Sequence, residues 1–281
     1  MAGRRCAVLG DPIAHSLSPT LHRAGYAEHG LDWSYDAQRV SSGGLPAFLE
    51  RLDPSWRGLS LTMPLKREAV ALATSLTDRA RLSGAANTLV LDGATLRGDN
   101  TDIPGVAAAL RERYSGPVDG AMILGGGATA TSAALALCEL GARELSLVVR
   151  SRHRAQETLD TVTSHPLRPI VRVHPLSAYD LNEVGGRAPL VVSTIPAIAQ
   201  TPEVLARVAV VPVVFEVLYD PWPTPLALAA GRNGQVLIGG LDLLAHQAAV
   251  QFELFTGLPA PLEAMRAAGE AELAHRSDPR G

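Results

Sequence analysis

Lys66 is the first residue of this chain that could carry out acid–base chemistry. It follows Pro64 in the stretch SLTMPLK, at the start of a helix that the pattern predicts over residues 64–73. The helix dipole opposes a lysine at a helix N-terminus, so this position favours a functional explanation. A lysine amine can donate a proton to a developing alkoxide. Taken alone, however, a lysine in such a place is more often a surface charge than a catalyst.

Four further polar residues of the first half stand beside small residues or turns. Ser16 and Ser18 in HSLSP share one face of an extended segment, so their hydroxyls can bind a carboxylate together. Ser18 is also a candidate N-cap for the helix that Pro19 begins. Asn87 in GAANTL precedes a strand, and Asp102 in GDNTDIPG precedes a helix. In isolation, Asn87 would be a turn former and Asp102 a helix cap.

The stretch Gly125–Ala134, GGGATATSAA, is typical of a phosphate-binding turn. It follows the apolar run AMIL and precedes an apolar helix, which is the context that such a turn requires. Gly125 and Gly127 form Gly-x-Gly, and Ala130 is the small residue three positions on. Small residues let the backbone approach a pyrophosphate, and the helix N-terminus attracts its charge. A tight strand–helix turn without a ligand is the alternative.

The next strand ends in VVRSRHR, which has no acidic residue to accept the ribose hydroxyls of NAD. Arginine matches a phosphate by charge and by paired hydrogen bonds. The sequence therefore predicts NADP as the cofactor, with Arg150 as the main contact and Ser151 beside it. A solvated basic helix start is the alternative, and it suits Arg152, His153 and Arg154 better than it suits Arg150.

Composition excludes several classes of protein. The 281 residues are 47% hydrophobic and 19% charged, as in a globular protein of one large or two ordinary domains. The net charge is −3, and the basic residues form no stripe of the kind that binds nucleic acid, so no nucleic acid is expected as a partner. Cys6 and Cys138 belong to no C-x-x-C motif, so no metal site is expected and the cytoplasm is the expected location. The uncharged segment Gly120–Cys138 reads as strand, turn and helix rather than a membrane span.

The elements that must position these residues follow from periodicity and turn signals. In the first half, strands are predicted over 4–9, 33–39 and 57–61, helices over 43–52, 64–73 and 76–82, and a hairpin around Asp92-Gly93. From Asp119 onward, strands AMIL, LSLVV, VRVHPL, PLVVSTIP and VVPVVFEVLY alternate with helices over 128–140 and 152–164, and a last helix covers 240–256. This alternation predicts an α/β fold with a doubly wound parallel sheet.

The motifs HSLSP, TMPLK, AANTL, DNTD, GGGATA, YDPWPTPL and GLDLLAHQ occur in one order along the chain. In this combination the chain resembles the shikimate dehydrogenase family from about Cys6 to Gly257. The resemblance implies NADP-dependent reduction of 3-dehydroshikimate to shikimate, in the shikimate pathway of aromatic amino-acid biosynthesis. It also implies an N-terminal α/β substrate domain, a Rossmann-like cofactor domain and a C-terminal helix that returns to the substrate domain. The boundaries we expect are 1–103 with 239–281 for the substrate-binding and catalytic domain, and 104–238 for the NADP-binding domain.

The resemblance also implies a role for each matching residue. Lys66 and Asp102 would be the catalytic pair, with Lys66 as the proton donor. The substrate would be bound by Ser16 and Ser18 at its carboxylate, with Tyr219 near it, and by Thr62, Asn87, Asp102 and Gln247 at its ring hydroxyls. The NADP contacts would be Gly125, Gly126, Gly127, Ala128, Thr129, Ala130, Arg150, Ser151, Arg154, Thr194 and Gly240.

The chain departs from the family pattern at several positions. Ser60 replaces an asparagine before the segment that contains Lys66, and Glu216 replaces an aspartate. The loop reads Gly-Gly-Gly-Ala-Thr instead of Gly-Ala-Gly-Gly-Ala, and Val149 replaces an asparagine that would contact the cofactor's adenosine end. None of these changes removes Lys66, Asp102 or Arg150.

Two other functions compete with the first. A quinate/shikimate dehydrogenase with broader cofactor use would share the fold and differ near Ser16, Ser18 and Tyr219. A non-catalytic NADP-binding sensor would keep the glycine loop and lose the proton-transfer pair, both members of which are present here. The expected assembly is a monomer or a homodimer, without a membrane or nucleic-acid partner.

Overall fold

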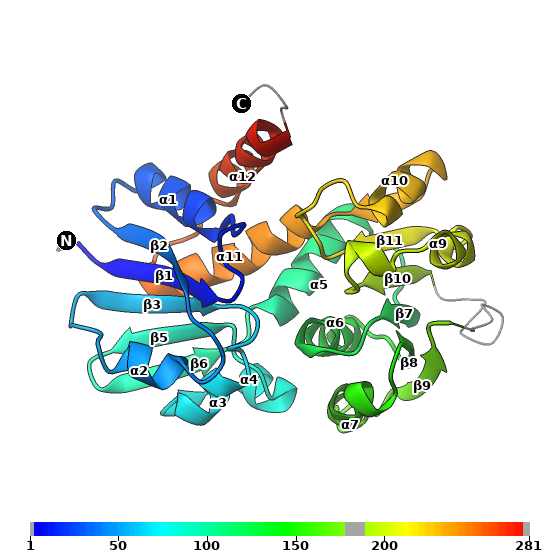
Figure 1. The fold of residues 1–281 in the computed structure, drawn as a ribbon, viewed down its shortest axis with the longest axis horizontal. Coiled ribbons are helices and arrows are strands. Elements are labelled where there is room, and N and C mark those ends of the chain that lie inside the picture. The colour runs from blue at the N-terminus through cyan, green and yellow to red at the C-terminus, as the bar shows by residue number, and fades with distance from the viewer. Residues whose placement is uncertain (1–2, 178–188, 278–281) are drawn as a thin grey trace. The chain divides into compact units, whose positions relative to one another are not determined.

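The computed structural model describes residues 3–177 and 189–277. The chain divides into two compact units. Unit 1 comprises the residues up to Thr101 together with those from Leu244 onward, and unit 2 is Asp102–Leu243. Each unit has its own six-stranded sheet, so each is described by itself (Figure 1).

Unit 1 contains a mixed sheet in the order β2-β1-β3-β5-β6-β4. Its strands are β1 (Arg5–Gly10), β2 (Ser34–Arg39), β3 (Trp56–Leu61), β4 (Ser75–Leu76), β5 (Thr88–Asp92) and β6 (Thr95–Asp99). Its helices are α1 (Ser18–Glu28), α2 (Leu45–Leu49), α3 (Glu68–Leu72), α4 (Asp78–Ser83), most of α11 (Gly240–Thr256) and α12 (Leu262–Ser277). Strands β1, β2 and β3 are parallel, whereas β5 is antiparallel to both β3 and β6.

Two layers of helices cover the sheet of unit 1. Helices α1 and α12 pack on each other, and α11 lies over β3, where the ring of Phe255 occupies the space that a Cβ on Gly58 would need. The aliphatic core around Leu9, Leu59 and Leu61 lies under α2 and α3. Figure 1 shows α1, α11 and α12 on one side of this sheet and α2 and α3 on the other.

Unit 2 contains an all-parallel sheet in the order β12-β11-β10-β7-β8-β9. Its strands are β7 (Gly120–Leu124), β8 (Glu144–Val149), β9 (Ile170–Pro175), β10 (Leu190–Ser193), β11 (Val213–Glu216) and β12 (Val236–Ile238). Its helices are α5 (Asp102–Arg113), α6 (Ala128–Glu139), η1 (His153–Ala155), α7 (Gln156–Thr163), η2 (Ala197–Ala199), α9 (Pro202–Val208) and α10 (Pro225–Arg232). Helix α6 packs between α5 and α7, as Figure 1 shows. The predicted α/β class with a doubly wound parallel sheet is confirmed.

The predicted helix over 64–73 begins later than expected. Residues 63–67 form turns, and α3 starts at Glu68. The carbonyl of Lys66 accepts a hydrogen bond from the backbone N–H of Ala86 at 2.8 Å. It therefore takes no part in the hydrogen bonds of α3. The N–H of Val70 donates instead to Arg67. Lys66 therefore lies in the turn before α3 and not in a helix.

Two other local predictions are corrected by the structure. The N-cap of α1 is Leu17, and Ser18 is the first helical residue, because the side chain of Ser16 accepts from the N–H of Ser18 at 3.3 Å. The helix predicted over 76–82 is present as α4, but it begins at Asp78 with Thr77 as its N-cap, because Leu76 belongs to the short β4. Strand β12 and helices α9, α10 and α12 were not predicted.

The hairpin predicted around Asp92-Gly93 is confirmed. Strands β5 and β6 pair antiparallel up to Asp92 opposite Thr95, and Gly93 has a φ of 58°. Glycine adopts this left-handed conformation without steric cost, which is why the tight turn falls there. The helix predicted over 240–256 is confirmed as α11, and Gly257, which follows it, has a φ of 74°.

A fully buried histidine should make the stability of unit 1 depend on pH. His22 stacks on Tyr35 with ring centroids 4.2 Å apart, and burial lowers its pKa from 6.5 to about 3. Between these two pH values the unfolded chain binds more protons, so the free energy of unfolding should decrease as the pH falls from 6.5 toward 3. Urea unfolding across this range, followed by the fluorescence of Trp33 and Trp56, measures the trend.

His22→Leu removes this titration, so its free energy of unfolding should vary less with pH than that of the wild type. The exposed His275 provides the control, since His275→Gln should keep the wild-type pH dependence. Equal pH dependence in His22→Leu and in the wild type would contradict the assignment.

Candidate active site

The predicted substrate residues of unit 1 come together because several strand ends meet at one edge of its sheet. Strands β1 and β3 are parallel and end at this edge, while the antiparallel β5 begins there and β6 ends there. The loops that leave β1 and β3 are hydrogen-bonded to each other through Thr62 N–H to the Leu9 carbonyl and Asp11 N–H to the Met63 carbonyl, both at 2.9 Å. Ser16, Thr62 and Asn87 thus belong to segments that leave or enter the sheet at one edge.

Asn87 is the centre of a buried hydrogen-bond network at this edge. Its Oδ1 accepts from the backbone N–H of Thr101 at 2.8 Å and from the hydroxyl of Thr88 at 2.8 Å. Its Nδ2 donates to Thr101 Oγ1 at 3.0 Å and to Gln247 Oε1 at 3.4 Å. A buried amide costs free energy unless its groups are bonded, so this environment fixes how the side chain lies.

Gln247 reaches this network from helix α11. Its Nε2 donates to the carbonyl of Leu244 at 3.0 Å, which leaves Oε1 to face Asn87 and Thr101. Gln247 is 7% exposed, and its amide both bonds a backbone carbonyl and contacts Asn87.

An ion pair holds the strand that leads into Thr101. The guanidinium of Arg79 donates to both carboxylate oxygens of Asp99, at 2.6 and 2.8 Å, and Thr77 donates to the same carboxylate at 2.7 Å. Asp99 is 1% exposed, and its Oδ1 also accepts from the N–H of Asn100. A bidentate arginine–carboxylate pair is directional, so it orients the Asn100–Thr101 segment toward Asn87.

Lys66 is held beside this network by its backbone. Its carbonyl is bonded to Ala86, the residue before Asn87, and its side chain is partly buried. Lys66 is also the only lysine in the sequence, since every other member of the Lys and Arg total of 25 is an arginine. Arginine retains its proton in proteins, whereas a lysine amine can release it. A single lysine at this edge is therefore the basic side chain suited to proton transfer.

Asp102 follows Thr101 directly and is the first residue of α5 in unit 2. Its side chain is 7% exposed. As a carboxylate in the first turn of a 12-residue helix it is favoured by the helix dipole, in line with the cap-like placement that the sequence allowed.

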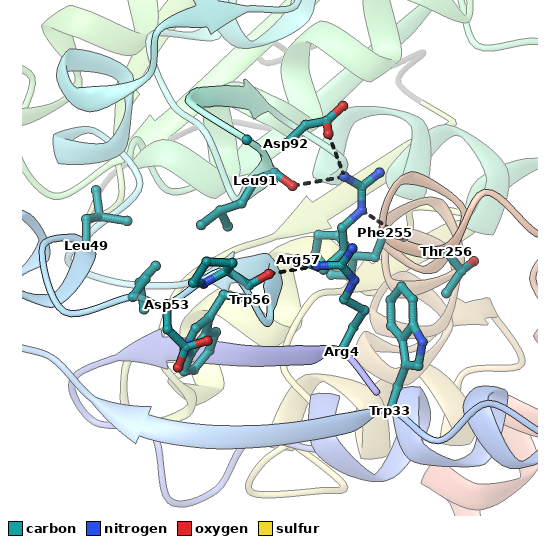
Figure 2. A pocket seen from close by; sticks show the side chains of 13 residues that line it. Arg4, Trp33, Leu49, Asp53, Trp56, Arg57, Leu91, Asp92, Phe255 and Thr256 are labelled. Carbon is teal, nitrogen blue, oxygen red and sulfur yellow. Dashed lines mark hydrogen bonds and ion pairs between the residues drawn. The ribbon is translucent and has the colours of Figure 1, made fainter. Parts of the chain in front are cut away.

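Helix α11 is anchored at its far end by Arg57. The guanidinium of Arg57 donates to the carbonyls of Phe255 and Leu91, both at 2.9 Å (Figure 2). A cavity of about 620 Å³ adjoins these residues, with Arg4, Trp33 and Asp92 also in its lining. It lies at the opposite ends of the strands from Asn87, and the bonds of Arg57 to backbone carbonyls give this cavity a structural explanation.

In unit 2 the glycine loop lies at the point where the strand order reverses, between β7 and β10. Gly125 has a φ of 117°, and a Cβ there would lie 2.1 Å from Oγ1 of Thr194, the residue after β10. A Cβ on Gly126 would lie 2.6 Å from that of Ala155. Ligands of doubly wound sheets bind at this switch point, where the backbone must come close to them.

Two threonines fix the carbonyl groups of this loop. Thr158 Oγ1 lies 3.0 Å from the carbonyl oxygen of Gly126, and Thr131 Oγ1 lies 3.2 Å from that of Gly127. The two hydroxyls are 2.8 Å apart, so one of them donates to the other and the second donates to its carbonyl. Ala128, Thr129 and Ala130 form the first turn of α6, whose N-terminus suits an anion.

The predicted phosphate contacts lie after β8, the next strand of the sheet. Arg150 and Arg154 are exposed, and Ser151 Oγ accepts from the N–H of Arg154 at 3.4 Å. Both arginines are therefore accessible to a phosphate from solvent. Gly240 begins α11, and a Cβ there would lie 2.4–2.5 Å from backbone atoms of Val217 and Leu218, next to Tyr219. Only glycine permits this close approach of β12 to the segment after β11.

Glu216 ends β11 as a buried carboxyl. It accepts from Gln200, from the hydroxyl of Thr224 at 3.1 Å and from the N–H of Leu218 at 3.1 Å. Burial raises its pKa to about 7, which these hydrogen bonds oppose. The side chain thus ties β11 to the turns that precede Tyr219 and α10.

Sequence reasoning missed several residues of the unit 1 network. Thr101 stands in the DNTD motif, from which only Asp102 was chosen, and Thr88 follows Asn87 directly. Gln251 is four positions after Gln247, so both lie on one face of a helix, and this spacing was an available signal. The pairing of Tyr35 with Ser60 had no signal, because the two residues are far apart in the sequence.

The glycine loop at the switch point of unit 2 has the form of a dinucleotide-binding turn. Two family models match the chain: the shikimate dehydrogenase substrate binding domain over residues 8–89, and the shikimate 5'-dehydrogenase C-terminal domain over residues 240–268. The NADP(+) shikimate dehydrogenase of Nitrobacter hamburgensis is 35% identical, over 96% of this chain and 95% of that protein.

Solved structures give the same result. The crystal structure of Mycobacterium tuberculosis shikimate dehydrogenase is 42% identical with a TM-score of 0.88, covering 95% of this chain and 99% of the other. The Thermus thermophilus shikimate 5-dehydrogenase, solved with NADP(H) and shikimate, is 30% identical with a TM-score of 0.79, covering 95% and 99%. The chain belongs to the shikimate dehydrogenase family.

The glycine loop should not tolerate a side chain at its first position. Gly125→Ala would place a methyl group against Thr194 in a backbone conformation that alanine avoids. We expect it to lower the free energy of unfolding by about 2 kcal/mol. Gly127→Ala is the matched control, because nothing lies within 4 Å of its Cβ position. Thermal unfolding of both variants measures the difference, and equal stability would refute the steric argument.

Proposed function

We propose that this protein is an NADP-dependent shikimate dehydrogenase that catalyses the reversible reduction of 3-dehydroshikimate to shikimate in the shikimate pathway. The observation that carries the proposal is the placement of the only lysine next to the buried Asn87 network, in a member of this family. In this proposal unit 1 binds the substrate and unit 2 binds NADP. For the domains we propose the boundaries expected from the sequence, 1–103 with 239–281 and 104–238, which lie two to five residues from the divisions between the two compact units.

The proposed substrate contacts divide by chemistry. Ser16 and Ser18 donate hydrogen bonds to the carboxylate, and Tyr219 contributes near it. Thr62, Asn87, Asp102 and Gln247 hold the ring hydroxyls. The support in unit 1 is that Asn87 and Gln247 present oriented amide groups, which can discriminate hydroxyl positions because a mismatched hydroxyl leaves a buried polar group unpaired.

The proposed chemistry needs one hydride and one proton. NADPH supplies the hydride when bound. Lys66 donates the proton to the oxygen that develops negative charge on the ketone carbon, and Asp102 holds the lysine and a neighbouring hydroxyl in place. In the reverse direction Lys66 accepts the hydroxyl proton. Positioned proton transfer of this kind contributes about 10²–10⁴-fold to the rate.

The proposed cofactor contacts are supported by the glycine loop and by the exposed arginines. Gly125, Gly126 and Gly127 leave the backbone open, and the first turn of α6, Ala128–Ala130, faces the pyrophosphate with its N–H groups. Arg150, with Ser151 and Arg154, binds the 2'-phosphate that distinguishes NADP from NAD. Thr194 and Gly240 complete the contacts from the two other segments that end at this edge of the unit 2 sheet.

We also propose a cytoplasmic monomer or homodimer. Both cysteines are free and buried, which suits a reducing compartment. Among the helices that the structure describes, none has the length and hydropathy that a membrane crossing requires.

Absorbance of the reduced nicotinamide tests the proposal, with shikimate and quinate each assayed against NADP and NAD. We expect turnover with shikimate and NADP. Arg150→Ala should raise the KM for NADP by about tenfold or more, by loss of a charged hydrogen bond, and leave that for NAD nearly unchanged. Arg172→Ala, which removes an exposed arginine paired with Glu144, is the control. Turnover of quinate with NAD would instead favour the broader enzyme, and NADP binding without any turnover would favour a sensor.

The single lysine permits a direct test of the proton donor. Lys66→Arg keeps the charge but removes the exchangeable amine, so kcat should fall about 10²–10⁴-fold with the KM for NADP retained. Acetylation of the wild type acts on two amines, Lys66 and the N-terminal amine, and turns each into an amide that no longer donates or accepts this proton. It should therefore inactivate the enzyme, and shikimate should protect it. Full activity after modification of Lys66 would exclude the lysine from the reaction.

A further inference from the structure

Gln251, one turn after Gln247 on α11, has an orientation that the backbone determines. Its Nε2 donates to the carbonyl of Asn87 at 3.2 Å. A carbonyl only accepts, so the nitrogen of this amide must point toward Asn87 and the oxygen must point away. The side chain is 1% exposed. Its amide therefore has a single orientation, with Nε2 toward the start of β5 and Oε1 toward Ser60 of β3.

This orientation determines where the hydroxyls of Ser60 and Tyr35 donate their protons. Gln251 Oε1 is 2.7 Å from Ser60 Oγ, so Ser60 must donate to it. Ser60 Oγ then accepts from the hydroxyl of Tyr35 at 2.6 Å. Ser60 has one hydroxyl proton, and that proton is committed to Gln251.

The other end of the chain of hydrogen bonds reaches Asn87. Gln251 Nε2 also donates to Thr88 Oγ1 at 2.9 Å, so the proton of Thr88 is directed to Asn87 Oδ1 at 2.8 Å. The backbone N–H of Thr101 donates to the same oxygen. Asn87 is thus held with Oδ1 inward and Nδ2 toward Thr101 and Gln247.

We propose that Gln251 is a positioning residue for substrate binding, which sets the orientation of the Asn87 amide through Thr88 and is itself set by Ser60 and Tyr35. The inference rests on the proposed function of Asn87 as a substrate contact. Gln251 touches no substrate in this scheme, and it acts by holding two groups on Asn87, the main-chain carbonyl and, through Thr88, the side-chain oxygen.

Other contacts already dock α11, so an anchoring role does not explain Gln251. Phe255 packs into the space over Gly58, Phe252 packs against Gly25, and Arg57 bonds the carbonyl of Phe255. Replacing a buried polar network with apolar groups of similar shape is often neutral for stability. A fully bonded glutamine at this position is better explained by the precision it imposes on Asn87.

Gln251→Met is the main test, because it keeps the volume and removes both the donor and the acceptor. We expect the KM for shikimate to rise about tenfold, as for one or two lost hydrogen bonds, with the KM for NADP within about twofold of wild type. Gln235→Met is the matched control: Gln235 Nε2 also donates to backbone carbonyls, those of Val208 and Val211, but in unit 2. Its shikimate KM should not change.

Ser60→Ala and Tyr35→Phe extend the test to the upstream members of the chain and remain available if Gln251→Met does not fold. Ser60→Ala removes the donor to Gln251 and should raise the shikimate KM by less than Gln251→Met does. Tyr35→Phe leaves Ser60 in place and should have the smallest effect. An unchanged shikimate KM in Gln251→Met, or an equal rise in Gln235→Met, overturns the proposal.

A second measurement does not depend on activity. The side-chain amide protons of Asn87, assigned by comparison with Asn87→Asp, should exchange with solvent at least about tenfold faster in Gln251→Met, or in Ser60→Ala if the former does not fold, than in the wild type. Unchanged exchange overturns the positioning role even if the protein does not turn over shikimate. Faster exchange with no shikimate turnover in the wild type would refute the proposed function while the positioning of Asn87 stands.

Discussion

The architecture of unit 1 depends on satisfying one buried amide. Asn87 enters β5 where water is excluded, so each of its polar groups must find a partner within the protein. The backbone of Thr101 and the side chains of Thr88 and Gln247 supply these partners, and they come from the start of β5, the end of β6 and the middle of α11. The β5–β6 hairpin and the distant helix α11 are thereby held in register, which gives the candidate site a defined geometry.

In unit 2 the geometry of the candidate cofactor site depends on close approaches of the backbone rather than on side chains. Gly125 meets Thr194 at the switch point of the parallel sheet, and Gly240 meets Leu218 beyond the ends of β12 and β11, both at distances that no Cβ would permit. A site built from peptide groups tolerates changes in the loop sequence as long as the residues stay small. The polar network of unit 1, by contrast, depends on individual side chains.

The arginines and the single lysine of unit 1 have different surroundings. Arg57 and Arg79 donate to backbone carbonyls and to a buried carboxylate, uses that suit a planar group that stays charged. The only lysine stands instead at the edge where the polar residues gather. A lysine amine can exchange its proton whereas a guanidinium cannot, which is the basis for proposing Lys66 as the proton donor.

Local pattern alone determined the glycine turn, the Asp92-Gly93 hairpin, the parallel α/β class and the extent of α11, because each depends on residues close in sequence. The order of the motifs determined the family. Tertiary structure decided the rest. Lys66 lies outside a helix because its carbonyl bonds Ala86, and Gln251 faces Asn87 because Phe255 and Arg57 set how α11 lies on the sheet. These contacts join residues between 20 and 198 positions apart, as in the bond from Arg57 to Phe255. No period or spacing along the chain encodes such contacts, since they exist only once the strands have paired and the helix has docked.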